Sequence, residues 1–378
     1  MKMFNLIITT EFGLESIVKR EALNLGLKDI NTSNGKVEFV GGPYEIALAN
    51  INIRCGERVL LKLDEFKALE FEDIYQNVYN SKILDTLPKD RKIIVNAKSK
   101  KSKITSLPAI QSVGKKAIID RLKEKFSIDW FKEDGLDYNF ELDINKDICT
   151  FTLDTTGDGL HKRGYREIAS KAPLRETIAS AMVNLSFWNK DRPLVDLFCG
   201  SGTILIEAAM IGRNIPSGMM RSFTSEKWDF IGHDIYQKVR DQAIEKIDYD
   251  SKLDLRGFDI DPNVIKVAKD NAAKFGLSSD IDFKNMDMRD RLLEDNYGVL
   301  ISNPPYGMRI SDKKNVDKLE IDLGKKMKRL PTWCSYILTA SEDFEKKFGK
   351  KASKKRKIYN GRIKTDYYQF YGPNPYRK

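Results

Sequence analysis

The sequence predicts an α/β fold in which a C-terminal domain with a doubly wound parallel sheet follows an α+β region. Two observations lead to this prediction. In the second half, short apolar segments such as PLVDLF (193–198) alternate with helical segments, which is typical of parallel strands covered by helices on both faces. The first half also mixes strands and helices but lacks that regular alternation, so a different architecture is expected there.

Each element of the N-terminal half follows from its own pattern. Apolar alternation indicates strands at 4–10, 35–41, 58–66 and 92–98, and a hairpin over 141–156 that turns at Asn145–Asp147. Helical periodicity indicates helices at 14–26, 43–53, 71–80 and 108–126. Residues 157–173, GDGLHKRGYREIASKAP, are rich in glycine and basic residues and lack periodicity, so they are expected to form a linker.

The C-terminal half follows a strand–helix rhythm. Helices are expected at 174–185, 203–212, 262–276 and 316–330. Strands are expected at 193–198, 253–260, 281–287, 297–305 and 334–340. This rhythm is the basis for the parallel sheet.

Composition narrows the classes of function. Lysine and arginine total 65 against 55 acidic residues, and the resulting net charge of +10 suits a polyanionic partner. Four dispersed cysteines without a CxxC pair, together with only two histidines, predict neither a disulfide framework nor a metal site. No signal peptide and no apolar run of roughly 20 residues is found, so a cytoplasmic protein is expected.

The first motif with chemical content is DLFCGSG (196–202), placed between a predicted strand and a predicted helix. Its glycines would allow a ligand to approach the backbone closely, and amide groups at the helix start could face polar atoms. The motif is neither a P-loop nor GxGxxG, and Asp196 favours a cationic or hydroxyl-bearing ligand over a phosphate. Alone, the pattern also fits a plain tight turn.

Two further acids end the next predicted strands. In GFDIDP (257–262), Asp259 could accept hydrogen bonds from both hydroxyls of a ribose, while Asp261 is expected to cap the helix that Pro262 opens. In NMDMRD, Asp287 could accept a hydrogen bond from an adenine amine. Either acid could instead serve only a turn or a cap.

The fourth motif, SNPPYG (302–307), is the most informative. Two consecutive prolines remove two amide donors and leave carbonyl groups free to accept hydrogen bonds. Asn303 adds another acceptor and Tyr306 adds a flat ring. This set suits an exocyclic amine on a base that stacks against an aromatic side chain.

In this order, the four motifs resemble motifs I to IV of class I S-adenosylmethionine-dependent methyltransferases, and NPPY resembles the enzymes that methylate adenine N6 or guanine N2. The resemblance implies S-adenosylmethionine as cofactor and S-adenosylhomocysteine as product. The cofactor residues it implies are Asp196, Cys199 (as a small buried filler of the loop), Gly200, Gly202, Asp259, Asp287 and Asn303. Asn303, Pro304 and Tyr306 would hold the target base.

Other segments resemble a narrower group. GLHKRGYR (159–166) and APLRETIAS (172–180) resemble the junction of THUMP-domain RNA methyltransferases. The insertion 214–228 and the tail 355–371 resemble the bacterial enzymes that methylate guanine N2 in 23S ribosomal RNA. This resemblance implies a ferredoxin-like region at 1–65, a THUMP domain at 66–156, a linker at 157–173 and one Rossmann-like catalytic domain at 174–378.

The expected activity is therefore methyl transfer to the N2 atom of a guanine in RNA, with 23S rRNA or a pre-ribosomal particle as the partner of a monomeric enzyme. Alternatives are a tRNA guanine-N2 methyltransferase, an N6-adenine methyltransferase and an RNA-binding assembly factor without catalysis. Basic runs predict the RNA contacts: Lys98, Lys100, Lys101, Lys103, Lys162, Arg163 and Arg166. Any such run can also be a solvated surface loop.

Overall fold

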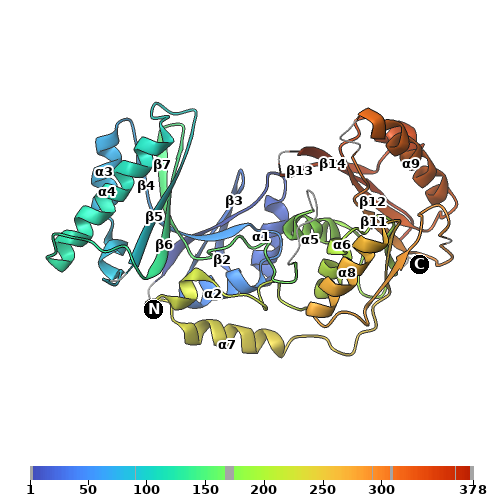
Figure 1. Ribbon diagram of the computed structural model, residues 1–378, viewed down its shortest axis with the longest axis horizontal. Helices are drawn as coiled ribbons and strands as arrows, with labels where there is room; N and C mark the ends of the chain where they lie inside the picture. The colour runs from blue at the N-terminus through green and yellow to red at the C-terminus, as the bar shows by residue number, and fades with distance from the viewer. Residues whose placement is uncertain are drawn as a thin grey trace.

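The computed structural model describes residues 3–89, 91–166, 174–291, 293–306, 310–361 and 363–374, apart from the side chains of 310–313. Two seven-stranded sheets organise these residues, one in each half of the chain. Figure 1 shows the two sheets in separate lobes, with the helix α7 (His233–Ile244) running beneath the junction between them. The architecture confirms an α+β N-terminal region and an α/β C-terminal domain.

The N-terminal sheet is continuous across the regions expected to be ferredoxin-like and THUMP. Its strands, in spatial order, are β2 (Lys28–Ser33), β3 (Lys36–Gly41), β1 (Phe4–Thr9), β4 (Arg58–Lys67), β7 (Ile148–Asp154), β6 (Leu136–Asn145) and β5 (Arg91–Lys100). Strand β4 pairs with β1 on one side and with β7 on the other, so the expected division after residue 65 lies within a shared strand. Strand β2 was not predicted; its residues are almost all solvent-exposed, so the alternation that marks a half-buried strand is missing.

The four helices described in this lobe cover the same face of its sheet. They are α1 (Glu15–Asn24), α2 (Pro43–Asn52), α3 (Phe71–Tyr79) and α4 (Leu107–Phe126). Leu61 of β4 and Leu153 of β7 are paired across the strands, and both belong to the core beneath these helices. The opposite face is open, and a hollow of about 460 Å³ lies on it.

The C-terminal sheet has the order β10 (Ile281–Asn285), β9 (Leu255–Asp259), β8 (Leu194–Asp196), β11 (Val299–Ser302), β12 (Cys334–Thr339), β14 (Ile363–Phe370) and β13 (Lys354–Asn360). The five strands from β10 to β12 are parallel, as predicted. Strand β14 pairs antiparallel with β12, so the sheet is mixed rather than wholly parallel. The reason is local: β13 and β14 form a hairpin, which needs no crossover helix.

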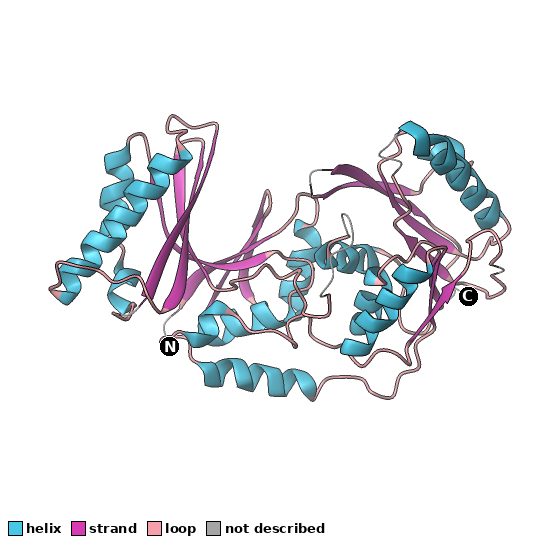
Figure 2. Cartoon of the chain, in the orientation of Figure 1, coloured by secondary structure: helices cyan, strands magenta, loops and turns pink. Residues whose placement is uncertain are grey.

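Helices cover both faces of this second sheet (Figure 2), which confirms the doubly wound arrangement. Alternate residues of the central strands β8, β11 and β12 belong to two separate cores; Leu194 and Val195 of β8 illustrate the division. The helices are α5 (Glu176–Leu185), α6 (Thr203–Gly212), α8 (Pro262–Lys274), α9 (Ile310–Lys328) and the short α10 (Phe344–Phe348); α9 begins before the expected residue 316. Short 3-10 turns occupy Lys82–Thr86 and Thr224–Lys227.

The segment between α6 and β9 joins the lobes. It includes α7, which was not predicted and which packs on α2. The Tyr44 hydroxyl donates to Gln242 at 2.7 Å, and the Asn50 amide donates to the Tyr236 hydroxyl at 3.0 Å. Trp228 stacks on Tyr138 of β6 with the ring centroids 5.0 Å apart.

The segment expected to be a linker is packed rather than loose where it is described. Leu160, Arg163 and Tyr165 are buried between the lobes. Residues 167–173 of the expected linker lie outside the described residues. The basic side chain of Arg163 has a buried carboxylate partner elsewhere in the chain, which holds this part of the expected linker in place.

Candidate functional site

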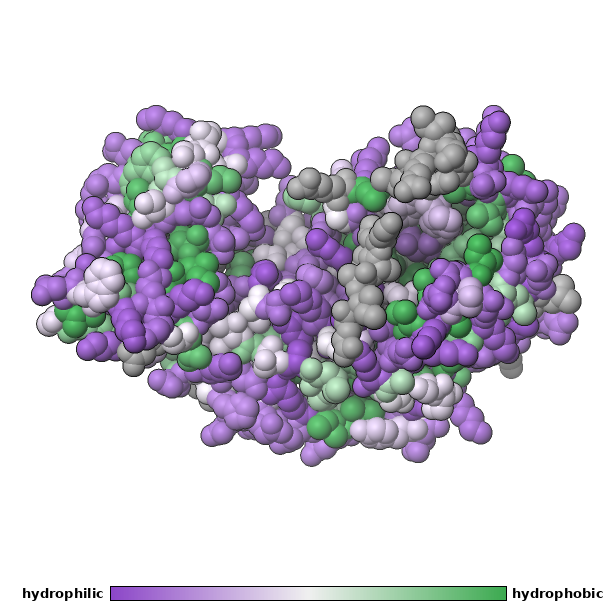
Figure 3. All heavy atoms as spheres, viewed as in Figure 1, coloured by the Kyte–Doolittle hydropathy of each residue, from purple (hydrophilic) through white to green (hydrophobic). Residues whose placement is uncertain are grey.

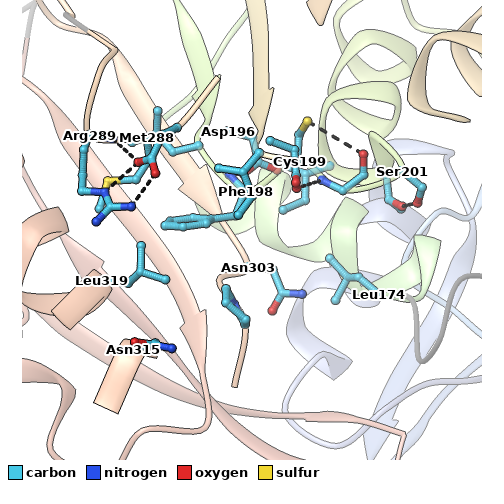
Figure 4. Close-up of a pocket in the computed structure, with 18 of the residues that line it drawn as sticks. Leu174, Asp196, Phe198, Cys199, Ser201, Met288, Arg289, Asn303, Asn315 and Leu319 are labelled. Carbon is cyan, nitrogen blue, oxygen red and sulfur yellow. Dashed lines mark hydrogen bonds and ion pairs between the residues drawn. The ribbon is translucent and has the colours of Figure 1, made fainter. Parts of the chain in front are cut away.

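A cavity of about 680 Å³ opens at the carboxyl ends of the central parallel strands, where the strand order reverses between β8 and β11. This is where open α/β sheets bind ligands. Six residues predicted to bind the cofactor line it: Asp196, Cys199, Gly200, Asp259, Asp287 and Asn303. Figure 4 shows Asn303 across the cavity from Phe198 and Cys199, between Leu319 and Leu174.

The turn after β8 depends on its glycines. Gly200 and Gly202 have φ angles of 51° and 82°, a region that favours glycine. A Cβ atom on Gly202 would lie 2.7 Å from Phe283, so α6 could not approach the sheet so closely. No atom lies within 4 Å of the Cβ position of Gly200, which leaves open space beside the cavity wall. Gly202 therefore shapes the loop without lining the cavity.

Asp196 is almost fully buried at the end of β8. Its Oδ1 accepts hydrogen bonds from the amide of Phe198 at 3.0 Å and from the Ser302 hydroxyl at 2.7 Å. Burial raises the pKa of this carboxyl to about 7, against the lowering effect of those hydrogen bonds. The Ser302 hydroxyl also accepts from the Leu197 amide at 3.1 Å, so it ties the first motif to the fourth.

Asp259 closes the same loop from the next strand. Its Oδ2 accepts from the Gly200 amide at 3.0 Å and its Oδ1 accepts from the Asp261 amide at 3.0 Å. Each carboxylate oxygen retains a lone pair for a ligand hydroxyl. Asp261 accepts from the Asn263 amide at 2.8 Å, which confirms its predicted role as the cap of α8.

Asp287 lies farther along the cavity wall. Its carboxylate accepts from both the side chain and the amide of Arg289, with Nε to Oδ1 at 2.9 Å. The hydrogen bonds from Arg289 lower the pKa of Asp287 to about 2, so the group is ionised at neutral pH. An ionised carboxylate is a suitable acceptor for an amine.

In the SNPPY segment, two predicted base-binding groups contact each other. The Tyr306 hydroxyl donates to Asn303 Oδ1 at 2.6 Å and also interacts with the side chain of Asn360, near the turn of the β13–β14 hairpin. Burial raises the pKa of Tyr306 to about 12, so the phenol is a donor at neutral pH. Pro304 is buried beside them. A base amine would have to share or displace the Tyr306 contact.

Sequence reasoning missed the apolar walls of the cavity. Phe198, Ile260, Met288 and Leu319 line it together with Arg289 and Lys318. Three of them directly follow a motif acid or lie two residues beyond one, which is the only signal that could have identified them. Leu319 could not be found in that way because it lies on α9, which carries none of the four motifs.

Four of the five lysines predicted to contact RNA lie in the N-terminal lobe. Lys98 and Lys100 line the hollow on the open sheet face, and Lys101 and Lys103 are exposed in the turn after β5. Lys98 forms an ion pair with Glu141 at 2.9 Å. Lys162 is also exposed, and it contacts Asp158 at 2.6 Å.

Two other predicted RNA contacts do not fit the structure. The side chain of Arg163 is completely buried, and its Nε lies 3.2 Å from Glu207 Oε1. Arg166 has a side-chain exposure of 12% and pairs with Glu176 at 3.1 Å. Both guanidinium groups are engaged by carboxylate partners within the protein.

The cavity fits S-adenosylmethionine. Its apolar residues suit an adenine ring, Asp259 retains acceptor capacity suited to ribose hydroxyls, and buried Asp196 suits a cationic amino-acid end. The open space beside Gly200 leaves room for close approach to the backbone. Among the described residues, no group of three or more His, Cys, Asp or Glu side chains could hold a metal ion. Nor does any described helix have the length and apolarity to cross a membrane.

Comparison with known families agrees with the fold. A family model described as "RMKL-like, methyltransferase domain" matches residues 163–369. The N-terminal half matches an "RlmL ferredoxin-like domain" at 5–60 and a "THUMP domain" at 68–154. The fold and cavity thus define a class I S-adenosylmethionine-dependent methyltransferase.

The chain belongs to the RMKL-like methyltransferase family, with a THUMP domain preceding the catalytic domain. It is 42% identical to a Bacillus subtilis (strain 168) protein named "Putative RNA methyltransferase YpsC", over 100% of this chain and 99% of that protein. It is 30% identical to the "Ribosomal RNA large subunit methyltransferase K/L" of Buchnera aphidicola (subsp. Acyrthosiphon pisum, strain APS) over 90% of this chain, but spans only 50% of that protein.

Two solved structures are also similar over almost the whole chain. The crystal structure of "SMU.472, a putative methyltransferase complexed with SAH" has 43% identity and a TM-score of 0.93, and the match covers 99% of both chains. A structure described as "a predicted N6-adenine-specific DNA methylase" from Listeria monocytogenes str. 4b F2365 has 44% identity and a TM-score of 0.94, covering 99% of this chain and 97% of that one.

Proposed function

We propose that this protein transfers a methyl group from S-adenosylmethionine to the exocyclic N2 of a guanine in RNA, and that its substrate is 23S rRNA or a pre-ribosomal particle. The single observation that carries the chemistry is Asn303, an amide acceptor at the wall of the cofactor cavity within an NPPY segment. The THUMP match and the names of the Bacillus and Buchnera relatives support RNA as the substrate.

The proposed cofactor contacts divide the cavity into two ends. Asp196, Cys199 and Gly200 would surround the amino-acid end, and Gly202 would keep the loop in place. Asp259 would accept from the ribose and Asp287 from the adenine amine. S-adenosylmethionine supplies a methyl group that is already activated by its sulfonium. The protein therefore has to provide orientation, proximity and a prepared nitrogen atom.

Asn303 and Pro304 prepare the nitrogen. An aromatic amine donates its lone pair into the ring, which makes it a poor nucleophile. When Asn303 Oδ1 and the Pro304 carbonyl accept its two hydrogens, electron density returns to the nitrogen. Tyr306 would stack on the base, a contact worth about 1–3 kcal/mol. The proton can leave to water after the transfer, so this scheme requires no basic side chain.

The Tyr306–Asn303 hydrogen bond sets a requirement for base entry. At 2.6 Å it occupies one of the two lone pairs of Asn303 Oδ1. The incoming amine would take the second lone pair, or Tyr306 would rotate away and stack. Because the target base is enclosed in such a site, it must be unpaired or flipped out of its helix.

The RNA itself would run along the open face of the N-terminal sheet toward the catalytic domain, in the notch between the two lobes (Figure 3). The exposed lysines of the turn after β5, Lys100, Lys101 and Lys103, would contact phosphates on one side. Lys98 would contribute less because Glu141 neutralises it. Lys162 is a further candidate at the junction. The enzyme would act as a monomer.

The test is methyl transfer from labelled S-adenosylmethionine to four substrates from cells that lack this enzyme: protein-free 23S rRNA, 16S rRNA, bulk tRNA and DNA. Nucleoside analysis then identifies the product. We expect N2-methylguanosine in 23S rRNA only. The same nucleoside confined to tRNA would overturn the ribosomal substrate, and no product with any substrate would favour a binding factor without catalysis.

A second candidate is N6-adenine methylation, which the description of the Listeria structure favours. The NPPY segment alone does not distinguish the two amines. N6-methyladenine in the same assay would establish this candidate and overturn the guanine assignment.

A further inference from the structure

Arg166 occupies an unusual position at the edge of the cofactor cavity. Its guanidinium Nη2 donates to Thr203 Oγ1 at 2.5 Å, and Nη1 lies 3.1 Å from Glu176 Oε1. Both Nη atoms also donate to the Leu174 carbonyl at 3.3 Å. One side chain thus joins three residues that are separated in the sequence by as many as 29 positions.

The partners of Arg166 belong to the cofactor site. Leu174 and Thr203 line the cavity, and Thr203 is the first residue of α6, directly after the glycine loop. Glu176 is the first residue of α5. Arg166 therefore holds together the starts of the two helices beside the proposed amino-acid end of the cofactor.

Helix electrostatics do not explain a cation at this point. The N-terminal end of a helix carries partial positive charge and favours acidic side chains. Arg166 lies at the N-terminal ends of both α5 and α6. The single negative charge of Glu176 balances the charge of Arg166 but leaves the partial positive charges of the two helix ends without a carboxylate of their own. A neutral or acidic residue would satisfy α5 and α6 better. The arginine instead bridges three groups at once, through its contacts with Leu174, Thr203 and Glu176.

The same segment is anchored to the N-terminal lobe. The Leu160 amide donates to the Glu57 carbonyl at 2.8 Å, and Arg163 Nη2 donates to the Arg54 carbonyl at 2.6 Å. Arg163 also pairs with Glu207 on α6, one face of which packs on α5. Residues 160–166 therefore contact the N-terminal lobe at one end and the cofactor loop at the other.

We propose that Arg166 is a positioning residue for the cofactor: by holding Leu174, Glu176 and Thr203 together, it sets the shape of the amino-acid end of the cavity. Residues 160–166 then control cofactor affinity, although none of them lines the cavity. This inference concerns the cofactor site and is independent of which base is methylated.

The test uses the full-length protein and calorimetric titration with S-adenosylhomocysteine, so that turnover does not interfere. Arg166→Gln should weaken binding about tenfold, which is the effect of removing one charge-assisted hydrogen bond. Arg166→Lys should recover part of the affinity, since the ammonium can still pair with Glu176. In steady-state assays, KM for S-adenosylmethionine should rise while kcat at saturation stays within twofold.

Arg213→Gln is the matched control. Arg213 caps the opposite end of α6 and pairs with Asp280, with side-chain exposures of 15% and 5%, so its environment is comparable. This variant should lower the thermal midpoint and leave S-adenosylhomocysteine affinity within twofold of wild type. Equal losses of affinity in the Arg166 and Arg213 variants would show a general stability effect and overturn the proposal.

A double-mutant cycle with Glu176→Gln tests the connection directly. Glu176 does not line the cavity, and we expect its effect on affinity to pass through Arg166. The two losses should overlap, and the double variant should bind no more weakly than Arg166→Gln. Fully additive losses in the cycle would refute the positioning role. If Arg166→Gln does not fold, Glu176→Gln is measured alone, and unchanged affinity in that folded variant would refute the positioning role.

Discussion

The cofactor cavity and the open face of the N-terminal sheet present opposite kinds of surface. In the cavity, single acids are fixed by backbone amides, as Asp259 is by Gly200 and Asp261, and Asp196 is almost fully buried. On the open face, charges are partly exposed and paired with one another, as Lys36 is with Asp143 and Lys98 with Glu141. Loss of one cavity residue should therefore be severe, whereas losses on the open face should be small and distributed.

The largest expected effect is that of Asn303→Ala on the rate. Removing an acceptor that acts on the reacting amine should lower kcat about 100-fold or more, by analogy with other groups that stabilise developing charge. S-adenosylhomocysteine affinity should stay within threefold, because the cofactor relies mainly on other residues. Single-turnover methyl transfer and calorimetry measure the two quantities, and full activity in this variant would show that the NPPY segment has another role.

Asp259→Ala should have the opposite effect. Affinity for S-adenosylhomocysteine should fall, while binding of the target base should remain. Loss of charge-assisted hydrogen bonds to a ligand costs about 1.5–3 kcal/mol, equivalent to about 10- to 100-fold in the dissociation constant for S-adenosylhomocysteine. Asp282→Ala is the control, since Asp282 is exposed on the neighbouring strand and pairs only with Lys284. A loss below threefold for Asp259→Ala would remove it from the cofactor site.

Asp196 should make cofactor binding depend on pH. Its pKa of about 7 means that the carboxyl is largely neutral at pH 6 and ionised at pH 8. A cationic ligand prefers the ionised form, so affinity should rise up to about tenfold between these values. Asp196→Asn should flatten the profile. A flat profile in the wild-type protein would contradict the proposed contact with a cation.

The raised pKa of Asp196 also makes the stability of the folded protein depend on pH. Between about pH 4 and 7, the folded protein binds more protons at Asp196 than the unfolded chain, whose pKa is near 3.8. The free energy of unfolding should therefore decrease as pH rises through that window. Denaturant titrations of wild type and Asp196→Asn at both ends of the window would separate this contribution from that of other groups.

On the open face, replacing Lys100, Lys101 and Lys103 together by glutamine should weaken RNA binding about 5- to 30-fold. The slope of log affinity against log salt should fall by about 0.7–0.9 for each phosphate that the variant no longer neutralises. A matched triple replacement of exposed lysines on α8 (Lys266, Lys269 and Lys274) controls for net charge. Equal weakening in both variants would indicate a general charge effect rather than a footprint at the turn.

The smallest expected effect is that of Glu141→Gln. This change frees Lys98 from its partner, and exposed ion pairs contribute only about 0–1 kcal/mol. RNA affinity at low salt should therefore increase about twofold. Weaker binding would mean that Lys98 needs Glu141 to hold its position. It would contradict the interpretation that Glu141 weakens the contact of Lys98 with RNA.

The comparison also explains what the sequence could predict. The glycine turn, the Asp261 cap and the acids at strand ends are local features, because neighbouring residues determine them. The partner of Arg163 is Glu207, 44 positions away, so a basic run in the sequence could not reveal that the side chain is buried. Strands β13 and β14 were not predicted, because the lysine-rich and mostly exposed β13 lacks the alternation of a half-buried strand and β14 pairs with it as a hairpin. The RNA footprint stays a prediction.

The most direct test of the central claim is the identity of the methylated nucleoside in 23S rRNA incubated with the wild-type protein and with Asn303→Ala. We expect N2-methylguanosine with the wild-type protein and none above background with the variant. N2-methylguanosine at equal levels with both proteins, or its absence with the wild type while another methylated nucleoside forms, would contradict the account.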